Sequence, residues 1–91
     1  MGLWARMAPG AENRIAVHRL AASCGELLRG ELTAQQVEAA FELDETESLE
    51  LNSILTRVSN GDISPQHVKD VFMLVELGDY PEAKAKSSLG Y

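Results

Sequence analysis

The sequence contains one cysteine, three prolines and few aromatic residues, and it has no long hydrophobic run. With Cys24 alone, an internal disulfide framework and a zinc site built from several thiolates are both excluded. No apolar stretch approaches the roughly 20 residues that a membrane-spanning helix needs. Arg6 and Pro9 interrupt the first ten residues, which therefore lack the apolar core of a secretory leader. We expect a protein without a membrane segment, made in a reducing compartment.

Positive charge is also scarce, since 8 Lys and Arg residues face 14 Asp and Glu residues, for a net charge of −6. Most acidic residues lie between 31 and 80, whereas residues 1–30 are mildly basic. A general nucleic-acid binder gains affinity by neutralising phosphates, so this balance disfavours one. A DNA-binding helix–turn–helix over 33–55 is disfavoured further, because Glu45 and Glu50 would face phosphates. The uneven charge could support head-to-tail association of copies, but solvated helix faces explain it more simply.

What the 91 residues do contain is 45% apolar side chains with a helical period. Apolar residues recur three and four positions apart, as on the buried face of an amphipathic helix. The expected helices span about 11–29, 33–43, 44–60, 64–77 and 81–89. No stretch alternates as a strand would. We predict an all-α, compact bundle of about five helices over residues 11–91, behind an extended N-terminal arm, residues 1–10.

Three helix starts are marked by capping residues. Thr33 with Gln36, and Asp44 with Glu47, have the spacing of a capping box, in which each side chain bonds the other's backbone N–H. Ser64 precedes a proline, the residue best suited to the first helical position because its missing N–H costs nothing there. These local signals agree with the period of the apolar residues and support the all-α prediction.

The chain also contains an internal repeat. Residues 30–37 (GELTAQQV) align with residues 61–68 (GDISPQHV), and Phe41 aligns with Phe72 at the same offset. Two copies are fewer than the roughly three that a solenoid needs. The repeat predicts a duplicated helix–Gly–cap–helix corner inside one bundle, with convergence of good capping sequences as the alternative.

No set of residues has the spacing of a catalytic or metal site. Residues 60–64 look like the middle of an EF-hand loop, but Thr56, Val58 and His67 stand where calcium ligands belong. His18 and His67 are not linked with a carboxylate in any triad or ligand pattern. We therefore expect no enzyme activity, no metal and no cofactor.

A short motif gives an alternative function. Glu47-Ser48-Leu49 resembles the Asp-Ser-Leu motif of acyl carrier proteins, which are small acidic helical bundles. That resemblance implies phosphopantetheine on Ser48 and a small acidic carrier or regulatory protein of the bacterial cytoplasm. The long loop that precedes the serine in carrier proteins is missing here, and a serine near a helix start is most often a helix-terminus residue.

Several large apolar residues exceed what a simple bundle needs on one face, and Trp and Met are enriched in interface cores. A simpler alternative for Met73 is that it packs under the last helix. We expect the arm and an apolar strip to dock onto neighbouring subunits. The predicted partner-binding residues are Trp4 and Met7 in the arm, Phe72, Met73, Leu77 and Tyr80 in the strip, and Tyr91 at the end.

A broader resemblance extends over roughly residues 27–91. Its residues are 30–45, 61–64 and 68–76, followed by Gly78, Tyr80 and Leu89-Gly90. They resemble the small helical virion-associated structural proteins of tailed bacteriophages. The resemblance implies a component of the virion, made in the bacterial host cytoplasm and located in the neck, the tail or a fibre attachment site. It implies as partners other virion structural proteins and copies of the chain itself.

The function expected from the sequence is that of a non-enzymatic structural or adaptor protein of such an assembly. Its function would be contact with other proteins, and it would need neither a cofactor nor a small-molecule substrate. Nucleic acid and membrane are not expected partners, because the charge balance and the short apolar runs disfavour both.

Overall fold

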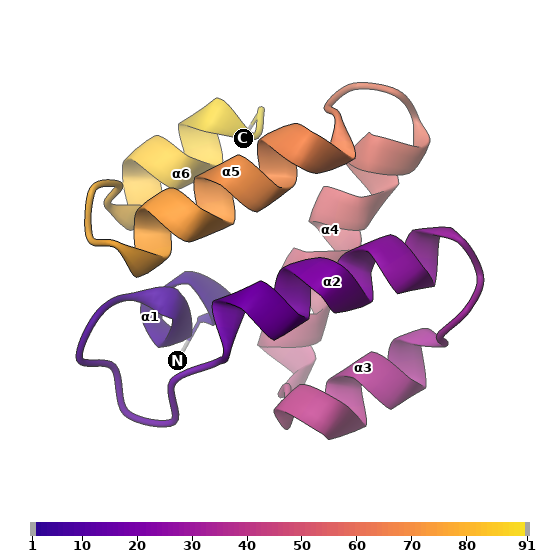
Figure 1. Cartoon of the computed structure of the whole chain (residues 1–91), viewed down its shortest axis with the longest axis horizontal. Helices are drawn as coiled ribbons and strands as arrows, with labels where there is room; N and C mark the ends of the chain where they lie inside the picture. Colours follow the sequence, from indigo (N-terminus) through magenta and orange to yellow (C-terminus); the bar gives the residue numbers. More distant parts are fainter. Residues whose placement is uncertain (1, 91) are drawn as a thin grey trace.

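The computed structural model describes residues 2–90, which contain six α-helices joined by loops and no strand (Figure 1). The helices are α1 (Leu3–Met7), α2 (Val17–Leu28), α3 (Ala34–Phe41), α4 (Glu45–Ser59), α5 (Pro65–Glu76) and α6 (Glu82–Ser88). The all-α prediction is confirmed. The helix that the sequence did not predict is α1, and α2 begins six residues later than expected.

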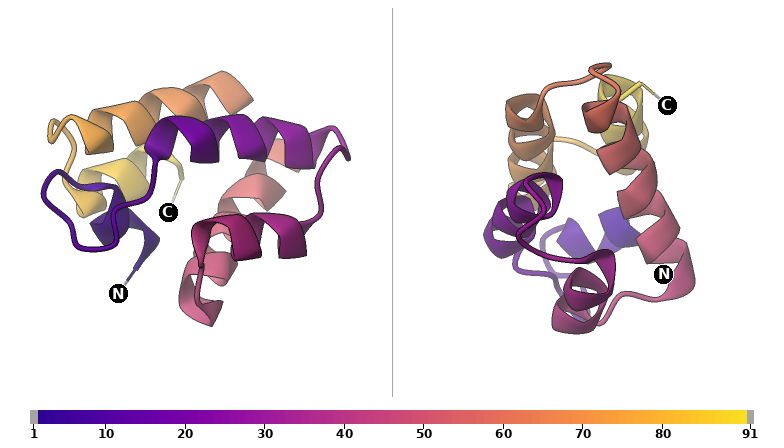
Figure 2. Two further views of the ribbon diagram at one scale, coloured as in Figure 1. Left: turned by 60° about the horizontal axis from the view of Figure 1, so that its bottom comes forward. Right: turned by 90° about the vertical axis from the view of Figure 1, so that its right-hand side faces the viewer.

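The helices form two layers. In Figure 1, α2 and α5 lie side by side and antiparallel at the front, and α4 crosses behind them. The side view in Figure 2 shows α4 on the far side of the core from α2 and α5. α6 packs on α5, α3 packs on α2, and the short α1 packs on both α4 and α5. Each of the predicted amphipathic helices therefore has a partner for its apolar face.

The helix starts follow the capping pattern of the sequence. Thr33 Oγ1 accepts the Gln36 N–H at 3.2 Å, and Gln36 Oε1 accepts the Thr33 N–H at 2.8 Å. Asp44 and Glu47 form the second reciprocal box at the start of α4. Ser64 caps α5 with a proline at its first position. These bonds satisfy N–H groups that a helix start leaves without partners, so all three predicted caps are confirmed.

Gly30 and Gly61, which align in the predicted repeat, end α2 and α4 with the same hydrogen-bond pattern that also follows α3 and α5. Gly30 and Gly61 are left-handed, with φ of +77° and +80°. In the first corner the glycine N–H donates to the carbonyl three residues earlier at 3.1 Å, and the next N–H to the carbonyl five residues earlier at 2.8 Å. The same two bonds in the second corner are 3.0 and 2.9 Å long. Both corners are thus Schellman motifs, and they turn α2 into α3 and α4 into α5.

The expected extended arm is wrong. Residues 3–7 form α1, and Leu3, Trp4 and Met7 are at most 1% exposed. The Trp4 ring stands edge-on to the Phe72 ring, with centroids 5.7 Å apart. In a domain this small, few large side chains are available to fill the centre, so burying a tryptophan gains more than leaving it on an arm. The breaking residues near position 10 instead form the loop between α1 and α2.

Candidate functional site

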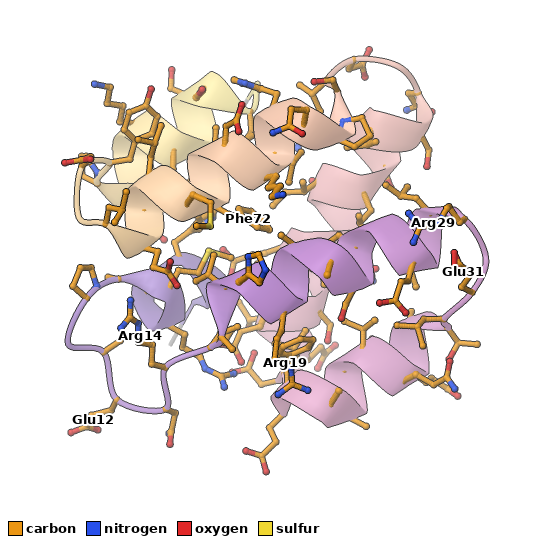
Figure 3. The ribbon with its side chains drawn as sticks, in the orientation of Figure 1. Glu12, Arg14, Arg19, Arg29, Glu31 and Phe72 are labelled. Atoms are coloured by element: carbon orange, nitrogen blue, oxygen red, sulfur yellow. The ribbon has the colours of Figure 1, made fainter. Side chains whose placement is uncertain are left out.

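Three of the predicted docking residues are in the core. Trp4 is 1% exposed, and Met7 and Phe72 are 0% exposed. Figure 3 shows Phe72 between the ribbons of α5 and α2. These three side chains have no surface to offer a partner in this structure, and assigning them to an interface was wrong. The physical reason is that apolar excess in the sequence does not say whether a side chain faces the core or a neighbour.

The other predicted docking residues remain at the surface. Met73 and Tyr80 are half-buried, and Leu77 is 67% exposed at the C-terminal end of α5. Met73 and Leu77 are four residues apart and share a helix face. We call these three residues the α5 patch. Tyr91 lies outside the described residues.

The surroundings of the α5 patch fix its shape. Gly78, with φ of +83°, turns the chain after α5, and a Cβ built on it would lie 3.4 Å from Pro9 Cγ. The loop after α1 thus abuts the end of α5. Lys84 Nζ lies 4.6 Å from the centre of the Tyr80 ring, a cation–π contact that holds this ring at the start of α6. The patch is therefore framed by three segments of the chain.

Leu49 is the other large apolar residue that the described chain leaves exposed, at 64%. It lies on α4, beside Ser48, whose side chain is half-buried in the first turn of that helix. Only residues 42–44 connect α3 to α4, so the long loop of the carrier proteins has no counterpart in the fold. Leu49 thus gives the α5 patch a matched control, equal in type and exposure.

The strongest polar site is one that the sequence did not predict. Arg6 Nη1 donates to both carboxylate oxygens of Glu47, at 3.0 and 3.1 Å. Arg6 also donates to the carbonyls of Phe41 at 3.0 Å, Glu42 at 3.2 Å and Asn13 at 2.9 Å. The side chains of Arg6 and Glu47 are 11% and 3% exposed. We call this arrangement the Arg6–Glu47 clasp.

The clasp joins a helix end to a helix start. Phe41 and Glu42 supply carbonyls at the C-terminal end of α3, where a cation is favoured, and Glu47 lies in the first turn of α4, where an anion is favoured. Glu47 Oε1 also accepts the Asp44 N–H at 3.0 Å as part of the capping box. The sequence revealed Glu47 as a capping residue but nothing local could link it with Arg6, 41 positions away.

A polar hollow of about 320 Å³ lies beside the clasp. Its lining residues are Arg6, Glu12, Asn13, Glu42, Asp44 and Glu47. The N–H groups of Arg6 are directed at carbonyls and at Glu47, so they are already used within the fold. Within residues 2–90, no group of three or more His, Cys, Asp or Glu side chains could hold a metal ion. The clasp therefore has the chemistry of a structural joint.

The remaining reactive side chains have structural surroundings. Burial raises the pKa of the Cys24 thiol to about 12, so it stays protonated at neutral pH. His67 Nε2 lies 2.8 Å from the Ser88 carbonyl oxygen and joins the start of α5 to the end of α6. Ser88 Oγ also lies 3.2 Å from His67 Nε2, a hydroxyl–imidazole contact that links the same two helix ends. His18 is exposed on α2.

Comparison with known proteins gives no relative from which to assign a function. No family model matches the chain, and neither the curated proteins nor the solved structures include a significant match. In residues 2–90, no helix combines the length and hydropathy needed to cross a membrane. The features of this chain that bear on its function are therefore those of its own surface.

Proposed function

We propose that this chain is a non-enzymatic structural or adaptor protein of a macromolecular assembly, most specifically a virion component of a tailed bacteriophage. In this proposal it acts in the neck, the tail or a fibre attachment site, through contact with other virion proteins and with copies of itself. The α5 patch is its docking surface. The pattern over residues 27–91 supports the virion assignment, and the patch supports docking.

The observation that carries the proposal is that Leu77 is 67% exposed and shares its helix face with the half-buried Met73. The equally exposed Leu49 on α4 serves as the comparison. Burial of an exposed leucine at an interface is favourable by about 1.5 kcal/mol or more. Tyr80, three residues further along the chain and half-buried, is of a residue type that often dominates binding energy.

A rigid base makes such a patch useful. The loop after α1 meets the end of α5 at Gly78. Arg14 of this loop forms an ion pair with Glu76 of α5, with Nη2 and Oε2 3.9 Å apart. The Arg6–Glu47 clasp fixes α1 at the other end of the same loop. A docking surface held in place before binding loses less conformational entropy when the partner arrives.

Incorporation into particles tests the proposal. Tagged chain is produced in infected host cells, and the purified particles are assayed for it by quantitative mass spectrometry. We expect a fixed stoichiometry for the wild-type chain and at least a tenfold loss for Leu77→Lys, because a buried, unpaired lysine is costly at an interface. Leu49→Lys changes the same residue type, exposure and charge elsewhere, and should be incorporated normally.

Two outcomes would contradict the proposal. Equal incorporation of the Leu77→Lys and Leu49→Lys chains would remove the α5 patch as the docking surface. Absence of the wild-type chain from particles, together with a covalent mass addition on Ser48, would instead favour the carrier alternative. Circular dichroism of both variants separates loss of docking from loss of folding.

A further inference from the structure

An apolar cavity of about 160 Å³ opens at the surface where α2, α4 and α5 meet. These segments come together on the right-hand side of Figure 1, far from α6 and the α5 patch. Six of its lining residues are apolar or weakly polar: Ala21, Cys24, Leu28, Leu55, Val58 and Val68. All six lie on α2, α4 and α5, and α2 packs against both of the other helices, so the cavity is built into the fold.

The size of the cavity selects its occupant. A cavity of about 150 Å³ with an apolar lining is large enough to hold benzene. The volume of about 160 Å³ thus suits one six-membered ring or a short branched alkyl group. Polar molecules without such a group would leave the apolar walls unfilled, and water in the cavity would find few partners.

The mouth of the cavity carries a positive charge. Lys69 lines it from α5, is exposed, and has no carboxylate of residues 2–90 within ion-pair distance. Its neighbour Asp70 is engaged elsewhere, because Gln66 Nε2 donates to Asp70 Oδ1 at 2.9 Å.

The acidic groups nearest the mouth face a different cation. Lys69 also lines an adjoining hollow with Glu26, Arg29 and Glu31. A hydrogen bond and the charge of Glu31, and then the charge of Glu26, raise the pKa of Arg29. Figure 3 shows Arg29 and Glu31 together at the corner between α2 and α3. The Lys69 ammonium is therefore the charge at this mouth that is left for a ligand.

We propose that this cavity binds a small monocarboxylate, with its ring or branched alkyl group between α2, α4 and α5 and its carboxylate against the Lys69 ammonium. This binding activity goes beyond the proposed docking function and uses a different surface. The apolar group supplies affinity by leaving water, and the carboxylate supplies selectivity over neutral and cationic molecules of the same shape.

Titration of the ¹⁵N-labelled full chain with three ring compounds tests the proposal. Benzoate, benzyl alcohol and benzylamine share one ring and differ in charge. We expect saturable shifts of the Gly25 and Val68 amides, with benzoate binding tightest and benzylamine weakest. Lys69→Gln should weaken benzoate binding by about two- to fivefold, the range for an exposed ion pair, and leave benzyl alcohol unchanged. Lys86→Gln, also on α6, removes the same charge at a distance and should change nothing.

The apolar wall of the cavity is tested by a separate variant and a separate measurement. Ala21→Leu places a larger side chain in the cavity and should abolish binding of all three compounds. In the wild-type chain, bound benzoate should also shift the amide signal of Cys24, which forms part of the wall. If Ala21→Leu fails to fold, the Lys69 variants and the shift of the Cys24 amide still decide the question.

Three outcomes would overturn the proposal. They are equal affinity for benzoate and benzylamine, shifts that map away from the cavity, and occupation of the cavity by a second copy of the chain. The last would appear in sedimentation as a dimer that benzoate dissociates. Because the Lys69 variants leave the α5 patch intact, failure here would not affect the particle-incorporation test.

Discussion

The Arg6 guanidinium lies against the Glu47 carboxylate with both carboxylate oxygens within 3.1 Å of Nη1, and Glu47 is the buried charged residue of the described core. The pair connects α1 to α4, and the same arginine closes the end of α3. Removing one partner of a buried ion pair leaves the other charge uncompensated. We therefore expect this removal to destabilise the fold by more than the intact pair stabilises it.

The first prediction concerns this pair. Glu47→Ala should lower the free energy of unfolding by about 3–5 kcal/mol, because it leaves the buried Arg6 charge unpaired and removes half of a capping box. Urea denaturation followed by circular dichroism measures the loss. Glu45→Ala, an exposed residue in the same turn of α4, is the matched control and should cost well under about 1 kcal/mol. In a double-mutant cycle with Arg6→Met, additive losses would show that the two residues are not coupled.

The second prediction concerns the N-terminal helix. Trp4→Ala should destabilise the whole bundle by about 3–5 kcal/mol, because it empties the space beside Phe72 in the core. The loss is a large part of the stability of a small domain, so the helical signal should melt at much lower temperature. Ala5→Ser, on the exposed side of α1, should leave the melting curve in place. A normal melting temperature for Trp4→Ala would mean that α1 does not belong to the core.

The third prediction concerns pH. Burial raises the pKa of Cys24 from 9.0 to about 12 in the folded chain. The unfolded chain releases this proton at the lower pH, so the contribution of the thiol to stability is fully present below pH 9 and is lost as pH rises toward 12. Cys24→Ala should show a shallower fall in stability between pH 9 and the highest pH at which the chain stays folded. Subtracting one stability curve from the other removes the contribution of lysine and tyrosine titration, which both chains share. Parallel curves would show that burial does not raise the pKa of Cys24 in the folded chain.

The fourth prediction concerns the two corners. Gly30→Ala and Gly61→Ala should each cost about 1 kcal/mol, because a Cβ strains a left-handed backbone even where there is room for it. Gly25→Ala, inside α2, is the control and should be neutral or stabilising, since its new Cβ would meet only the flexible Arg29 side chain at 3.2 Å. Thermal melts of the three variants measure the differences. Unequal losses of stability at the two corners would show that the residues around each glycine, and not only the shared hydrogen bonds, decide the effect.

Local sequence was a good guide wherever local physics decides the outcome. Thr33, Asp44 and Ser64 each start a helix because a side chain within three residues satisfies a backbone N–H. Gly30 and Gly61 each end one because a left-handed residue is needed there. The same reasoning predicted α2 to α6, with α2 starting six residues too early.

Contacts between residues far apart in the sequence could not be predicted from local sequence. The predicted helix over 11–29 begins too early, because residues 11–16 form a loop, with Asn13 left-handed, that brings Ile15 and Val17 into the core. Trp4 was predicted to dock onto a partner, yet it packs in the core against Phe72, which is far away in the sequence. The cavity between α2, α4 and α5 has walls from three helices, and no one of them indicates a hollow.

The amino-acid sequence by itself therefore determined the helical class, most helix boundaries and the two glycine corners, because each depends on bonds between residues at most five positions apart. Tertiary structure alone decided that the N-terminal segment belongs to the core, that Arg6 and Glu47 meet, and that Leu77 stays in water. The physical reason is that burial and charge pairing depend on which surfaces the folded chain brings together, and those surfaces come from segments far apart in the sequence.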